Sequence, residues 1–147
     1  MGDDLASANV NRSYSLATSS IAIFTFTLFF LYPRCRSGDA NGLLFQATLL
    51  VMGAATFSFV FASLLHYYSS LGSRVDDSER GRYARRGDRF WLLGFTMIFL
   101  APSLILFSIG LVVVGLAWSA LWLIYLLFMI RLFPRIQAAY RREAEAD

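Results

Sequence analysis

The sequence has few of the residues that build metal, redox or disulfide sites. It contains one cysteine, Cys35, and one histidine, His66. A protein zinc site needs three or four ligands, and thiol exchange needs a CxxC motif. We therefore expect no metal, no cofactor and no disulfide within the chain, and we interpret His66 as a packing residue. A disulfide between Cys35 residues of two chains stays open.

Charged residues are also scarce. They make up 16% of the 147 residues, against about 25% in soluble domains. Three runs of 21, 34 and 41 residues lack Asp, Glu, Lys and Arg altogether: 13–33, 40–73 and 90–130. Apolar runs of roughly 18 residues or more are typical of transmembrane helices. These runs argue against a soluble enzyme, a disordered chain and a small secreted module.

The lengths of the runs predict how often the chain crosses a membrane. As one helix the third run would be about 62 Å long, twice the thickness of the hydrocarbon core, so we expect it to turn back at Gly110 and Gly115. The sequence thus predicts an all-α integral membrane protein, a four-transmembrane-helix bundle. We expect a segment 1–13, a single domain 14–133 with spans 14–32, 43–68, 90–109 and 116–133 and a charged loop 69–89, and a tail 134–147.

Arginine predicts the orientation. The chain has no lysine, and with four spans 11 of its 13 arginines share one side with both termini, whereas Arg34 and Arg36 lie on the other. The positive-inside rule then predicts a multi-pass protein of the cell membrane (inner or plasma membrane) with both termini cytoplasmic. The expected partners are the lipid bilayer and its anionic headgroups, and no nucleic acid. The candidate headgroup contacts are Arg82, Arg85, Arg86 and Arg89.

Small and hydroxyl-bearing residues recur at helical spacing in the first three spans. Such residues let helices approach closely in lipid, so we expect these faces to meet in the bundle interior. Lining of a hydrated path is the alternative reading. The candidates for packing or pore lining are Ser15, Thr18 and Thr25 in the first span, Gly53, Thr56, Ser63 and His66 in the second, and Gly94 and Ser108 in the third.

Further features bear on function. Asp, Glu, Lys and Arg are absent from the interior of the predicted spans. Their absence argues against a pump, a voltage sensor or an ion-coupled carrier. Pro102 predicts a kink in the third span and is a candidate hinge. We expect a non-enzymatic accessory or structural subunit, acting through helix–helix assembly with itself or with a membrane-protein partner. The alternative is a small homo-oligomeric channel or transporter with a Ser/Thr-lined path.

Overall fold

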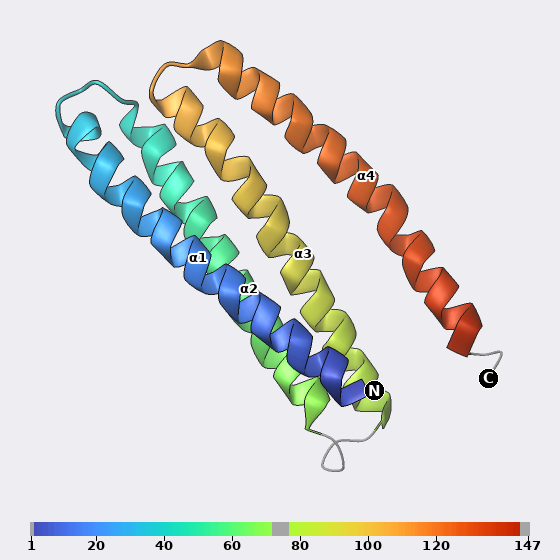
Figure 1. The fold of residues 1–147 in the computed structure, drawn as a ribbon. Coiled ribbons are helices and arrows are strands. Elements are labelled where there is room, and N and C mark those ends of the chain that lie inside the picture. Colours follow the sequence, from blue (N-terminus) through green and yellow to red (C-terminus); the bar gives the residue numbers. More distant parts are fainter. Residues whose placement is uncertain (1, 72–76, 145–147) are drawn as a thin grey trace.

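The residues that the structure describes form four long helices (Figure 1). The computed structural model describes the backbone of residues 2–71 and 77–144, and the side chains of residues 7–71 and 79–131. The helices are α1 (Gly2–Arg36), α2 (Gly42–Ser70), α3 (Asp77–Ser108) and α4 (Val112–Ala144). All four are long and apolar enough to cross a membrane. The prediction of an all-helical chain is confirmed.

Two connections at one end of the molecule are tight turns with glycine in the left-handed region. Gly38 has a φ of 85° and Gly110 a φ of 81°, a conformation that costs a glycine little because it has no Cβ. Asn41 caps α2, since its Oδ1 accepts hydrogen bonds from the backbone N–H groups of Leu43 and Leu44. Its own N–H donates to the carbonyl of Ser108 at 2.8 Å, which joins the two turns.

The helices are longer than the predicted spans. α1 begins at Gly2, and α4 continues to Ala144. The predicted loop 69–89 is mostly helical, because α3 begins at Asp77. The chain turns back at Gly110 as predicted, whereas Gly115 lies inside α4. Arginine, alanine and glutamate are good helix formers in water, so a helix need not stop where its apolar run stops.

α2 lies at the centre of the packed part of the molecule. It packs against α1 on one side and α3 on the other, and therefore buries residues on two faces. Thr48, Met52, Ala55, Phe59 and Ala62 of α2 are fully buried. α4 packs chiefly against α3 and stands apart from α1 and α2 (Figure 1). The arrangement is more open than a closed four-helix bundle, and Gly115 is the one buried residue in the described part of α4, 112–131.

The folded molecule has two distinct ends. The start of α1, the end of α2, the start of α3 and the end of α4 lie at the same end of the molecule, with the end of α4 apart from the others (Figure 1); we call this the terminal end. The turns at Gly38 and Gly110 lie at the opposite end, which we call the turn end. An even number of long helices returns the chain to the side where it began.

Candidate functional site

The structure places the small-residue rows of α2 and α3 in the bundle interior. Ser63, His66, Gly94 and Ser108 are buried, and Gly53 and Thr56 are half-buried. A Cβ added to Gly94 would lie 2.8 Å from Cε1 of Phe59, so this glycine allows α3 to approach α2 closely.

The row expected on α1 lies on the other side of its helix. Ser15, Thr18 and Thr25 are exposed, and the Thr18 and Thr25 hydroxyls donate to carbonyls of their own helix. The expectation that these three face the bundle interior is therefore not met. The buried row is offset by two residues, about 200° around a helix. It consists of Ser13, Ala17, Ser20, Thr27 and Leu31.

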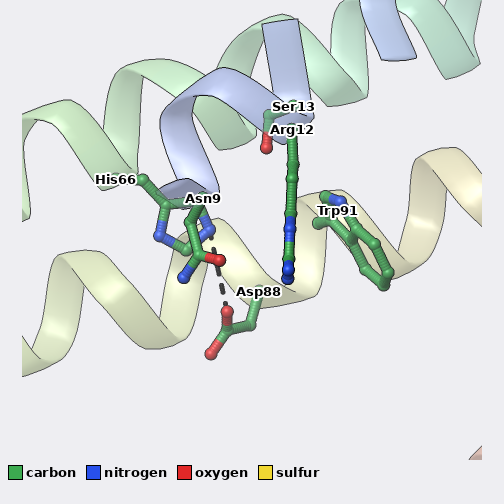
Figure 2. A pocket seen from close by; sticks show the side chains of 6 residues that line it. All are labelled: Asn9, Arg12, Ser13, His66, Asp88 and Trp91. Atoms are coloured by element: carbon green, nitrogen blue, oxygen red, sulfur yellow. Dashed lines mark ion pairs between the residues drawn. The ribbon is translucent and has the colours of Figure 1, made fainter. Parts of the chain in front are cut away.

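Polar side chains from three helices line a cavity of about 190 Å³ near the terminal end, the terminal pocket (Figure 2). Helix α1 contributes residues at positions i, i+3 and i+4, which share one face. Helix α3 contributes two residues at i and i+3, which also share a face, and α2 contributes its histidine. The lining residues are Asn9, Arg12 and Ser13 of α1, His66 of α2, and Asp88 and Trp91 of α3.

His66 and Asp88 face each other across the contact between α2 and α3 (Figure 2). His66 Nε2 lies 3.7 Å from Asp88 Oδ1, with the imidazole 5% exposed and the carboxylate 45% exposed. Gly87 provides the space for the ring, because a Cβ there would lie 2.9 Å from His66 Nε2. Ser69 Oγ donates to the His66 carbonyl at 2.7 Å. The His66 ring is thus enclosed, whereas the Asp88 carboxylate is partly open.

Ser13 lies at the wall of the terminal pocket and has an unused hydrogen-bonding group. The residue is fully buried, and its Oγ has no hydrogen-bond partner. In Figure 2 this oxygen points from α1 toward the space between His66 and Arg12. Arg12 is exposed, and in Figure 2 its side chain extends from α1 toward Asp88. A buried hydroxyl without a partner is costly, and the Ser13 hydroxyl is enclosed by the protein, so a molecule in the pocket does not reach it.

The pocket has the residue types of a catalytic triad without its geometry. A serine nucleophile must be hydrogen-bonded to its base and reachable by a substrate. Ser13 Oγ has no partner and is buried, and the 3.7 Å between His66 and Asp88 exceeds the length of a hydrogen bond. Within the described residues, no three His, Cys, Asp or Glu side chains come together as a metal site would require. The geometry therefore fits binding better than nucleophilic or metal chemistry.

The four arginines predicted to contact headgroups form one stripe on α3. They occupy positions i, i+3, i+4 and i+7, which share a helical face, and all four are exposed. They are Arg82, Arg85, Arg86 and Arg89. Nearby, Arg80 Nε donates to the carbonyl of Ser69 at 3.0 Å, which ties the start of α3 to the end of α2.

Aromatic residues attach α4 to α3. Trp118 Nε1 donates to the carbonyl of Phe99 at 3.0 Å, and Trp122 Nε1 donates to the carbonyl of Thr96 at 2.8 Å. One helical turn further, the Tyr125 ring lies 5.1 Å from the ring of Phe99. The two indoles thus donate hydrogen bonds to the stretch of α3 just before Pro102. α3 is a continuous helix through this proline, and a hinge at Pro102 stays a prediction.

Sequence reasoning did not single out five of the six pocket residues. Asn9, Arg12, Ser13, Asp88 and Trp91 come from helices that are far apart in sequence, and their meeting depends on how each helix is rotated. One signal was available: Arg12 and Asp88 lie at the borders of long uncharged runs, where polar side chains of several helices reach the same depth.

Comparison with family models, with curated proteins and with solved structures gave no match to this chain.

Proposed function

We propose that this chain is an integral membrane protein that crosses the cell membrane four times with both termini in the cytoplasm. It acts without catalysis, as a structural or accessory subunit that associates through α1 with a second copy of itself. The exposed row of small residues on α1 carries the proposal. Ser15, Thr18, Ala22 and Thr25 are all exposed, and in lipid such residues let two helices approach closely.

The surroundings of the row favour another helix over lipid as its occupant. Large apolar side chains border it on α1, including Ile21 and Phe26, which are 52% and 61% exposed. A row of small residues between large ones is a groove along the helix, which a second α1 can fill through the same surface in a two-fold arrangement.

The experiment fills the groove and measures the mass of the assembly. Ala22→Phe places a ring in the middle of the row, and Ile23→Phe adds a ring beside it as a matched control. Light scattering of the purified protein in mild detergent should give a dimer for the wild type and for Ile23→Phe, and a monomer for Ala22→Phe. A monomeric wild type, or a dimeric Ala22→Phe, would contradict self-association through this row.

Flux through liposomes separates this proposal from the alternative of an oligomeric channel or transporter. Thr25→Val keeps the shape of the side chain and removes the hydroxyl. If the row lines a path, the wild type conducts and Thr25→Val changes the flux without changing the mass. If the row packs, no flux is expected from either protein.

The proposed membrane partners include anionic headgroups at the cytoplasmic surface. The stripe of Arg82, Arg85, Arg86 and Arg89 supports this, because juxtamembrane arginines attract anionic lipids by about 1 kcal/mol each. Binding to the headgroups also favours the proposed orientation, with the terminal end facing the cytoplasm.

A further inference from the structure

The terminal pocket lies where apolar helix surface gives way to charge. Arg12 directly precedes the uncharged run 13–33, and Asp88 lies one residue before the end of the charged segment that precedes run 90–130. If the uncharged runs cross the hydrocarbon core, the pocket lies at the depth of the lipid headgroups. Trp91 fits this depth, because tryptophan is enriched at the interface between lipid and water.

The two formal charges of the pocket are opposite and unpaired with each other. Arg12 and Asp88 both line it, yet no ion pair joins these two side chains, both of which the structure describes. Asp88 faces His66 at 3.7 Å, beyond hydrogen-bond length. The pocket therefore presents a cation and an anion that are not paired with each other, and the ring of Trp91 also lines it.

The neutral hydrogen-bonding side chains Asn9 and Ser13 belong to α1, as Arg12 does. Asn9 and Ser13 come from the same face of α1 as Arg12, and Ser13 Oγ is buried without a partner. A phosphate group offers acceptor oxygens that a guanidinium and an amide can both bind. A carboxylate such as Asp88 repels phosphate but accepts hydrogen bonds from an ammonium group.

We propose that the terminal pocket binds the headgroup of a zwitterionic aminophospholipid, of the phosphatidylethanolamine type, from the adjacent leaflet. Arg12 and Asn9 bind the phosphate, and Asp88 binds the primary ammonium. The cavity of about 190 Å³ is well above the ~15 Å³ that a single water needs, and its open side at Arg12 and Asp88 leaves a way in for the headgroup. The inference needs the membrane-spanning arrangement but not self-association through α1.

The test is native mass spectrometry of the full-length protein, delipidated in detergent and then mixed with equal amounts of phosphatidylethanolamine, phosphatidylglycerol and phosphatidylcholine. We expect one phosphatidylethanolamine per chain, preferred over each of the other lipids. Arg12→Gln and Asp88→Asn should each reduce its retention about tenfold, the effect of one charge-assisted hydrogen bond. Asp88→Asn should also raise the retention of phosphatidylglycerol, because the repulsion between the Asp88 carboxylate and the lipid phosphate is removed.

Control variants make the outcome specific. Arg34→Gln removes the same charge from the turn end of α1 and should leave phosphatidylethanolamine retention unchanged. Ser13→Ala removes a buried hydroxyl that the lipid does not reach and should leave phosphatidylethanolamine retention unchanged. The helical circular dichroism of each variant shows whether it is folded. If Arg12→Gln does not fold, the proposal is still tested by Asp88→Asn, which should retain less phosphatidylethanolamine and more phosphatidylglycerol.

Each contrary result overturns the proposal. A preference for phosphatidylglycerol in the wild type would make the pocket an anionic-lipid site. Displacement of the lipid by millimolar inorganic phosphate or free phosphoethanolamine would make it a site for a soluble phosphate. Equal retention of the three lipids in wild type and variants would mean that the pocket holds only water. None of these results depends on whether the protein is a monomer or a dimer.

Discussion

Glycines that look alike in the sequence differ in what surrounds them. Gly94 of α3 faces the ring of Phe59, and an added Cβ would lie 2.8 Å from Cε1 of this ring. Phe59 is fully buried, and its ring contacts the edge of Phe95 at 5.7 Å between centroids, so it cannot easily move away. Gly53 of α2 has no atom within 4 Å of an added Cβ. Both glycines were predicted to be packing or pore-lining residues, and the structure shows a close contact with Phe59 at Gly94.

We expect Gly94→Ala to lower the free energy of unfolding by about 1–3 kcal/mol, the usual cost of overpacking. Gly53→Ala should leave it unchanged or raise it by about 0.5–1 kcal/mol, because alanine favours the helix. Unfolding in mixed micelles, followed by circular dichroism, measures both. Equal effects of the two substitutions would contradict the contact between Gly94 and Phe59.

Among the helices, α4 is held differently from the other three. Its described part buries a single residue, Gly115, and its exposed surface carries large apolar side chains such as Leu121, Leu123 and Leu127. In the proposed bilayer the lipid would be as apolar as these side chains, so the hydrophobic effect would not drive α4 onto α3. The indole hydrogen bonds of Trp118 and Trp122 to carbonyls of α3 therefore account for much of the attachment.

Replacing both tryptophans by phenylalanine keeps aromatic surface and removes two donors. Each interhelical hydrogen bond in a membrane contributes about 0.6–2 kcal/mol, so Trp118→Phe with Trp122→Phe should let α4 move away from α3. Spin labels at Leu93→Cys and Leu127→Cys, with Cys35→Ser to remove the native thiol, report the distance. The distribution should broaden in the double variant and stay as in the parent protein in Leu123→Phe. An unchanged distribution in the double variant would show that other contacts hold α4.

For the molecule as a whole, the main feature is the difference between its two ends. The described arginines of the terminal end include Arg12 and the exposed stripe on α3, whereas Arg34 and Arg36 close α1 at the turn end. Four helices of sufficient length and hydropathy connect the ends. A charge difference of this kind selects one orientation during insertion.

Labelling of single cysteines tests the proposed orientation. Cys35 near the turn end should react in intact cells with a thiol reagent that cannot cross the membrane. A Cys35→Ser protein that carries Arg85→Cys at the terminal end should react only after the cells are permeabilised. Reaction of both positions from the same side would contradict four crossings, and the reverse pattern would contradict cytoplasmic termini.

The helices and their turns could be predicted from the sequence because their causes are local. An uncharged run must match or exceed the thickness of the hydrocarbon core, which gives the number of helices. A run of 41 residues is too long for one crossing and must turn, and Gly110 turns it. The ends of the helices were harder to predict, because charged residues such as those of 77–89 continue a helix into water as readily as they form a loop.

The terminal pocket and the packed face of α1 depend on contacts between helices. Rows that start at Ser13 and at Ser15 both carry small residues at helical spacing, on opposite sides of α1, and no local rule distinguishes them. Packing against α2 buries the first row and exposes the second. The same packing brings Asp88 to 3.7 Å from His66 and places Arg12 beside them. Each residue turns a helix by about 100°, so the side chains that meet are chosen by the rotation of three packed helices, which the sequence of any one of them leaves open.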